Sequence, residues 1–313
     1  MSALEVVAAQ APDEAVPDEP AARTRRSRRR GWLLGVAGVL ALAVLWEAYK
    51  LVAPADGVSL GGMRVLPRSS AIAMPHLWDM VARALQPLNG ATGARPLWLA
   101  VLAACLFSLG VAAVGWLVAV VVGLLAAIVM QRFRTAQSAL LPWVVLSQTV
   151  PLIALAPLVR RWGAELRFGA VPWHDWMSVS VIAAYLAFFP VAVGALRGFG
   201  SPQPVHLDLM RSYGVGWWRT FVTLRLPASV PHLVPALRLA AANAVVGTVV
   251  AEVSIGLRGG IGRMIVEFGQ SGSSDPPKQW SPIAGAVLVG LAATGAVSLL
   301  SFALRRYHQA EAA

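Results

Sequence analysis

The stretch LWLAVLAACLFSLGVAAVGWLVAVVVGLLAAIVM, residues 97–130, contains no charged residue. About 20 apolar residues cross the hydrocarbon core of a bilayer as one helix. We therefore expect a short first helix near 97–108 and a membrane span near 109–130. Of the 313 residues, 57% are hydrophobic and only 13% charged, about half the charge of a soluble domain. This composition excludes a soluble globular enzyme, a disordered protein and a disulfide scaffold, and predicts an integral membrane protein.

Other apolar runs extend the pattern to an all-α membrane protein with about six transmembrane helices. Residues 1–30 (acidic, then Arg-rich) are predicted to be a disordered cytoplasmic tail, and 31–53 to be the first transmembrane helix. Residues 54–96 form an extracytoplasmic connector, in which 70–85 are expected to lie on the membrane surface as a helix. The membrane core is predicted over 97–304, before a cytoplasmic tail at 305–313. Its later spans are expected near 138–159, 176–199, 233–255 and 282–304.

The third span contains Pro142, Pro151 and Pro157. Interior prolines kink or break helices and free backbone carbonyls, which must then face protein or a water-filled cavity. Polar residues inside spans are costly and tend to line such cavities, but they serve equally well as hydrogen bonds between helices. The candidates for lining such a cavity are Ser147, Gln148, Thr149, Asn243 and Thr248.

Basic residues predict the orientation, because cytoplasmic loops collect Lys and Arg. The arginines of 23–30, with Arg132, Arg134, Arg305 and Arg306, favour a multi-pass membrane protein with both termini in the cytoplasm. A secretory signal is the competing interpretation of the N-terminus, but the apolar run is too long for a signal core. The formal net charge of +11 is explained by basic residues in cytoplasmic loops, and the arginine run by contact with anionic lipid rather than with nucleic acid.

The chain shows no catalytic motif. It has no G-x-x-x-x-G-K-[ST] phosphate loop, and GLRGGIG at 256–262 is predicted to be a turn or a re-entrant segment. The five histidines are scattered and Cys105 is the single cysteine, so no metal site is expected. Glu47 and Glu252 lie near span ends, where a lone acid is usually solvated. We expect no enzyme, no metal and no cofactor in this chain.

The most informative loop is DLMRSYGVGWWRTFVTLRLP, residues 208–227. Its apolar residues recur every three or four positions, as in an amphipathic helix. Gly214 and Gly216 interrupt the pattern and permit a turn. The loop thus predicts two short amphipathic helices, for which a protein partner and the lipid headgroups are equally good explanations.

This loop resembles the signature of ABC importer permeases, which reads Glu-Ala-Ala, three residues, Gly, nine residues, Ile, one residue, Leu-Pro. Asp208 takes the acidic position, Gly214 the glycine and Leu224 the isoleucine, and Leu226-Pro227 close the motif; Leu209-Met210 depart from Ala-Ala. The resemblance is strongest to the nitrate/sulfonate/taurine-type branch and covers roughly 97–304.

The resemblance implies a transporter of the bacterial inner membrane with two permease subunits, expected to be identical, an ABC ATPase dimer that holds ATP and Mg, and an extracytoplasmic solute-binding protein. Residues 208–227 would contain the coupling helix that docks in the ATPase. The translocation path would lie between the permease subunits and would be lined by the polar candidates named above. Gly214 would turn the chain, Pro227 would end the second helix, and Arg211 would pair with the ATPase or with Asp208. The coupling residues implied are Asp208, Arg211, Gly214, Leu224, Leu226 and Pro227.

Two other functions compete with an importer permease. A membrane scaffold or sensor whose loop binds a regulator explains the amphipathic loop but not its match to the signature. An ion-coupled transporter should show inverted repeats or intramembrane acids, and neither is clear in the sequence. Members of the resembling family carry nitrate, sulfonates such as taurine, or vitamins and thiamine-pyrimidine precursors, and the long loop 256–281 favours the last group.

Overall fold

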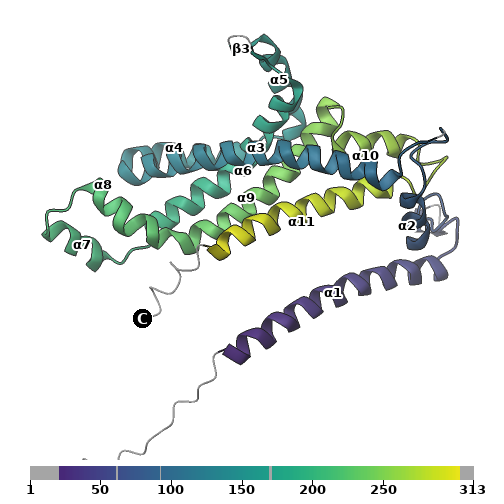
Figure 1. Ribbon diagram of the computed structural model, residues 1–313, viewed down its shortest axis with the longest axis horizontal. Helices are drawn as coiled ribbons and strands as arrows, with labels where there is room; N and C mark the ends of the chain where they lie inside the picture. Colours follow the sequence, from purple (N-terminus) through teal and green to yellow (C-terminus); the bar gives the residue numbers. More distant parts are fainter. Residues whose placement is uncertain (1–20, 61–62, 92, 169–170, 304–313) are drawn as a thin grey trace, which may run out of the picture. The chain divides into compact units, whose positions relative to one another are not determined.

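The computed structural model describes residues 21–60, 63–91, 93–168 and 171–303 (Figure 1). Residues 1–20 of the expected N-terminal tail (1–30) and the whole expected tail at 305–313 lie outside these residues. The chain divides into two compact units, Met1–Ser70 and Ala71–Ala313, which are described separately below.

The described part of the first unit is one long helix followed by a hairpin. Helix α1 (Ala21–Val52) already contains the Arg-rich stretch that we expected to precede the first span. Strands β1 (Val58–Leu60) and β2 (Met63–Leu66) pair antiparallel. The Tyr49 hydroxyl donates to the Pro67 carbonyl at 3.0 Å, and the Ser69 hydroxyl to the Ala53 carbonyl at 2.7 Å. These two bonds tie the end of the hairpin back to the end of α1.

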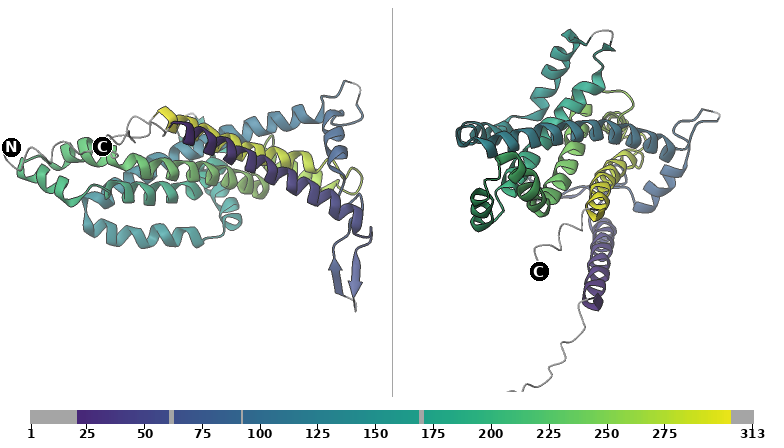
Figure 2. Two further views of the ribbon diagram at one scale, coloured as in Figure 1. Left: turned by 90° about the horizontal axis from the view of Figure 1, so that it is seen from below. Right: turned by 60° about the vertical axis from the view of Figure 1, so that its left-hand side comes forward.

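The second unit is a helical bundle. In Figures 1 and 2, the signature loop (residues 208–227) lies at one end of the bundle and the helix over residues 261–270 at the other. The helices are α2 (Leu77–Leu85), α3 (Leu97–Arg132), α4 (Arg134–Leu146), α5 (Leu152–Glu165), α6 (Asp175–Phe199), α7 (Pro204–Ser212), α8 (Trp217–Thr220), α9 (Leu226–Ile255), α10 (Ile261–Gln270) and α11 (Trp280–Ala303). The shorter elements are the 3-10 turn η2 (Ser147–Thr149), the π-helical turn η3 (Phe221–Arg225), and the antiparallel strands β3 (Arg167–Phe168) and β4 (Val171–Pro172).

Helix α6 is the centre of the bundle, and it packs against both α3 and α9. Small residues make these contacts close. A Cβ added to Gly123 of α3 would lie 2.8 Å from the Val191 Cβ, and one on Gly247 of α9 would lie 3.0 Å from the Ala183 Cα. The contact region of these three helices is therefore built largely from Ala, Gly and Val.

The first half of the core differs from the sequence prediction. Helix α3 is one continuous helix from Leu97 to Arg132, so the expected division into 97–108 and 109–130 is wrong. The chain has no proline between Pro96 and Pro142, and glycines alone do not break a helix that neighbours support. The expected surface helix at 70–85 is shorter than predicted, since α2 begins at Leu77.

The third span breaks where the prolines indicated. Helices α4 and α5 meet at an angle of 104°, and Pro151 directly precedes α5. Pro142 and Pro157 instead remain inside α4 and α5. Figures 1 and 2 show α5 projecting from the bundle beyond this break.

The fifth span is longer than predicted, because α8, η3 and α9 form a single helical stretch from Trp217 to Ile255. We expected Pro227 to end a helix, and this prediction is wrong. Pro227 lies in the first turn of α9. Proline lacks the N–H that a helix interior requires, and the π-helical turn η3 changes the hydrogen-bond pattern directly before it. The helix therefore continues through the proline.

Five helices within the described residues are long and apolar enough to cross a membrane, or six if the bent pair of α4 and α5 forms one span. Apart from the two short hairpins, the secondary-structure elements assigned among the described residues are all helices. This architecture is the all-α membrane bundle that the sequence predicted.

Candidate functional site

The signature loop forms two short helices joined by a tight glycine turn. Gly214 has a φ of +68°, in the left-handed region. Its N–H donates to the Arg211 carbonyl at 2.9 Å, and the Val215 N–H donates to the Met210 carbonyl at 3.0 Å. These bonds cap the last carbonyls of α7 in a Schellman motif, which favours glycine at this position. The prediction of two short helices joined by a glycine turn is confirmed, and the Schellman motif explains why the turn falls at Gly214.

The loop presents apolar side chains to its surroundings. Tyr213 is 77% exposed, Trp218 66% and Leu209 54%. Asp208 and Arg211 form an exposed ion pair at 3.1 Å within α7. Of the two partners considered for Arg211, Asp208 is therefore in contact with it in this structure.

Aromatic rings attach the loop to the bundle. Phe221 is buried and stacks on Trp217 with ring centroids 5.2 Å apart, and it also meets Phe199 of α6 edge-on with ring centroids 4.9 Å apart. The Arg132 guanidinium, at the end of α3, lies 5.3 Å from the Trp217 ring, a cation–π arrangement. The loop is thus fixed to the ends of both α3 and α6.

The closing residues of the signature lie where η3 becomes α9. Leu224 is half-buried and Leu226 is exposed. Arg225, between them, donates from Nη1 to the Phe199 carbonyl at 2.7 Å, one of the carbonyls left without an intrahelical partner at the end of α6. Pro227 is half-buried in the first turn of α9.

The break between α4 and α5 holds three of the candidate path residues. The Ser147 and Thr149 hydroxyls donate to the Val144 and Leu146 carbonyls at 2.7 and 2.8 Å. The Gln148 amide donates to the Ser147 hydroxyl at 3.2 Å. The Tyr185 hydroxyl of α6 donates to the Ser147 carbonyl. Tyr185 was not among the candidates, although a tyrosine inside an apolar span is a signal that would have identified it.

The two candidates on α9 have different environments. Asn243 is half-buried and donates from Nδ2 to the Leu186 carbonyl at 3.3 Å. Since Leu186 follows Tyr185 in α6, the structure brings Asn243 and Ser147 to adjacent residues of one helix. Thr248 is fully buried, and its hydroxyl has no hydrogen-bond partner among the described residues.

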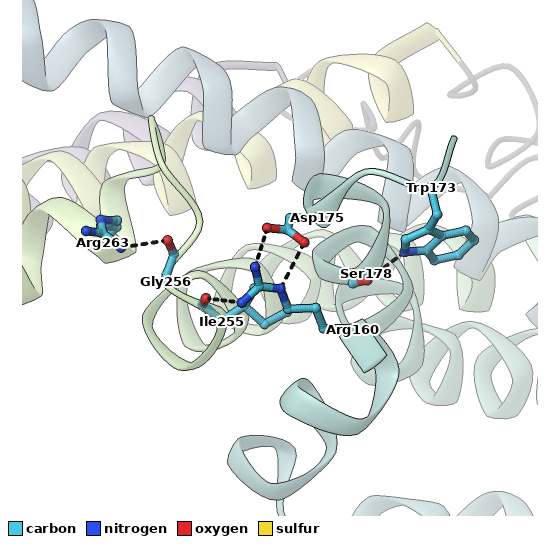
Figure 3. A network of polar contacts seen from close by, with 7 residues as sticks. All are labelled: Arg160, Trp173, Asp175, Ser178, Ile255, Gly256 and Arg263. Atoms are coloured by element: carbon cyan, nitrogen blue, oxygen red, sulfur yellow. Dashed lines mark hydrogen bonds and ion pairs between the residues drawn. The ribbon is translucent and has the colours of Figure 1, made fainter. Parts of the chain in front are cut away.

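A polar network anchors α5 on the far side of the break (Figure 3). Arg160 binds both carboxylate oxygens of Asp175, at the start of α6, at 2.9 Å each, and its Nη1 donates to the Ile255 carbonyl at 3.3 Å. Arg263 of α10 donates to the Gly256 carbonyl at 2.8 Å. Two arginines therefore satisfy carbonyls at the end of α9, where positive charge is favourable.

The prediction that the acids near span ends are solvated is wrong for one of them. Glu252, expected to be solvated near a span end, is fully buried in the last turn of α9. The Ser108 hydroxyl of α3 donates to one of its oxygens at 2.6 Å, and the Gly262 N–H to the other at 2.8 Å. Spacing along α9 does not reveal this burial, because α3 and α10 create it.

These features define a class: a multi-span helical membrane protein with a broken span and a two-helix loop held by the bundle. Residues 119–311 match the family described as binding-protein-dependent transport system inner membrane component. That match covers more than half of the chain, so the chain belongs to this family. It is an ABC importer permease and a multi-pass inner-membrane protein, as the resemblance implied.

Curated relatives agree with this assignment. The formylaminopyrimidine transport permease protein ThiX of Halalkalibacterium halodurans is 30% identical over 62% of this chain and 72% of its own length. A probable ABC transporter permease protein of Haemophilus influenzae is 30% identical over 49% of this chain and 58% of its own. The putative aliphatic sulfonates transport permease protein SsuC of Bacillus subtilis is 30% identical over 51% and 54%. The matched segments thus cover little more than half of the length of the second and third of these relatives.

Proposed function

We propose that this chain is the membrane subunit through which a small solute enters the cytoplasm, driven by a separate ABC ATPase that docks on residues 208–227. The observation that carries the proposal is the loop itself. Its apolar side chains, Leu209, Tyr213 and Trp218, are exposed, while Phe221 and Arg225 hold it to the bundle. A short helix with exposed apolar residues and a rigid attachment suits docking in a groove. ATP and Mg would be held by the ATPase dimer.

The proposed path borders the break between α4 and α5. Non-helical backbone at membrane depth is tolerated only where protein covers it or where it lines a water-filled cavity. Thr149, Val150 and Pro151 are exposed at this break. A second permease subunit facing the break would cover it and enclose a path lined by Ser147, Gln148, Thr149 and Asn243. Thr248 is buried and would therefore lie behind the lining of the path without facing the solute.

For the solute, we propose a pyrimidine precursor or related vitamin-type compound before a sulfonate or nitrate. ThiX, a formylaminopyrimidine permease by name, is matched over more of its length than SsuC. An extracytoplasmic solute-binding protein would supply most of the selectivity. The test is uptake of labelled formylaminopyrimidine against labelled taurine, in cells that carry the chain with the proteins encoded beside it. Uptake of taurine alone would reverse this order.

The docking proposal is tested by purification from membranes with a tagged chain. Wild type should recover an ABC ATPase, and Gly214→Trp should lose it and lose uptake. No atom lies within 4 Å of a Cβ placed on Gly214, so the bulky side chain would extend from the docking surface without disturbing the bundle. Gly214→Ala is the matched control, since it carries the same backbone strain with little bulk. Full ATPase recovery with Gly214→Trp would contradict the docking site.

A further inference from the structure

The buried Glu252 caps a helix to which it does not belong. One carboxylate oxygen accepts the Gly262 N–H of α10 at 2.8 Å. The other accepts the Ser108 hydroxyl at 2.6 Å, and this hydroxyl oxygen in turn accepts the Ile261 N–H at 2.9 Å. The first two N–H groups of α10 are therefore satisfied from α9 and α3.

This cap replaces the usual local one. The first N–H groups of a helix have no intrahelical partner, and an N-cap side chain normally accepts one of them. The N-cap of α10 is Gly260, which makes no such bond. A carboxylate is the best substitute, because it bonds strongly to N–H groups and its charge suits the positive end of a helix.

The glycines beside Glu252 are required by this arrangement. A Cβ on Gly260 would overlap the Glu252 carboxyl group, and one on Gly262 would lie 2.9 Å from the Glu252 Cβ and 2.5 Å from the Val249 carbonyl oxygen. The segment before α10 contains Gly256 and Gly259, both with positive φ. Two polar links therefore join the end of α9 to the first turn of α10: the Glu252 carboxylate and the bond from Arg263 to the Gly256 carbonyl at 2.8 Å.

The link lies at the far end of the helix that begins in the signature loop. One helical stretch runs from Trp217 to Ile255, with α8 at its start and Glu252 in its last turn. Figure 1 shows α8 and α10 at opposite ends of the bundle. A displacement of the loop along this stretch would therefore arrive at Glu252.

We propose that Glu252 is a positioning residue that makes α10 move together with α9, so that movement of the signature loop reaches the opposite end of the bundle. The proposal rests on the proposed function, because the ATPase supplies the movement. Ser108 is the second member of the link. Arg263 links α10 to Gly256, the residue that follows α9, rather than to the last turn of α9. Its ion-pair partner Glu267, at 2.6 Å, is not part of the Glu252 link.

The experiment is hydrogen exchange of the full chain with its ATPase in lipid nanodiscs, nucleotide-free and trapped with ATP and vanadate. Glu252→Ala should accelerate exchange at the start of α10 by about tenfold, the order expected for loss of a helix cap. Glu252→Gln should have a smaller effect, since its amide oxygen still accepts the Gly262 N–H. Glu267→Ala is the matched control for loss of an acid and should resemble wild type.

The nucleotide response separates positioning from simple support. In wild type, trapping should change exchange in both the signature loop and α10. In Glu252→Ala the change in the loop should remain and the change in α10 should disappear. An α10 that responds to trapping in Glu252→Ala as in wild type overturns the proposal, and so does an α10 that does not respond in wild type while the loop does.

A double-mutant comparison protects against misfolding of one variant. Gly260→Ala should perturb α10 strongly in wild type but weakly in Glu252→Ala, because the clash is with the carboxyl group; additive effects would overturn the arrangement. If wild type binds no ATPase, the proposed function fails, whereas the nucleotide-free comparison of variants still tests the cap. The two failures are therefore distinguishable.

Discussion

Single glycines set the distance between α6 and α9. A Cβ on Gly198 would lie 2.8 Å from the Ser229 Cβ, and one on Gly194 would overlap the Ala236 Cβ. Gly194 and Gly198 are four residues apart and therefore lie on one face of α6. Glycines alone do not mark such contacts, since Cβ atoms added to Gly290 and Gly295 of α11 would have no neighbour within 4 Å.

Gly198→Val should therefore destabilise the bundle. Overpacking of a close contact costs roughly 1–3 kcal/mol, so the apparent Tm of the purified chain in detergent should fall. Gly290→Val, an identical change in open space, is the control and should leave the Tm near that of wild type. Equal Tm values for the two variants would contradict the close contact between α6 and α9.

Gln148→Ala and Asn243→Ala should lower solute uptake if these side chains line the path. The matched variant is Thr248→Val, which removes a buried hydroxyl without a described partner while keeping the shape. It should leave uptake unchanged, because no hydrogen bond is lost. Uptake measured in cells with equal amounts of each variant tests the assignment. Loss of uptake in Thr248→Val alone would exchange the roles of these positions.

At the scale of elements, the effect of proline on a helix differs from one position to the next. Pro151 lies at the break, directly before α5. Pro142 and Pro157 lie inside helices, and Pro227 lies in a first turn. Sequence reasoning predicted a break but not which proline makes it, because neighbouring helices decide whether a freed carbonyl finds a donor. At the break, Tyr185 supplies a donor for the Ser147 carbonyl.

Helix α5 should lose its anchor in Arg160→Gln. The Arg160 and Asp175 side chains are 50% and 42% exposed, so the pair itself contributes about 1 kcal/mol or less, and the Tm should change little. Exchange of α5 amides should nevertheless rise several-fold, because the Asp175 and Ile255 contacts are lost together. Arg161→Gln, beside it, is the control, and a similar rise in that variant would show that charge alone matters.

At the scale of the whole molecule, an exposed break between α4 and α5 within the membrane must be covered by protein or line a water-filled cavity. Val150 and Ile153 are exposed apolar residues on either side of Pro151. In the proposed transporter with two copies of this chain, the same break of each copy would face the shared path.

Cross-linking tests this assembly directly. On a Cys105→Ser background, Val150→Cys should form a disulfide-linked dimer of this chain in oxidised membranes. Val205→Cys, exposed on α7 and outside the bundle, is the control and should remain monomeric. A cross-link from Val150→Cys to a different permease would mean a heterodimer, and no cross-link at all would contradict a path at this break.

The sequence by itself determined the membrane class, the approximate number of spans and the signature loop with its turn at Gly214. These follow from composition, from periodicity along one helix and from the spacing within one motif, all of which are local. Only the structure decided that α3 is continuous, that the helix from Trp217 passes through Pro227 by way of the π-helical turn before it, and that Glu252 is buried. The burial of Glu252 depends on atoms supplied by other helices: a bare carboxylate or N–H group costs free energy in an apolar interior, and whether it is satisfied depends on a neighbour that lies far away in the sequence.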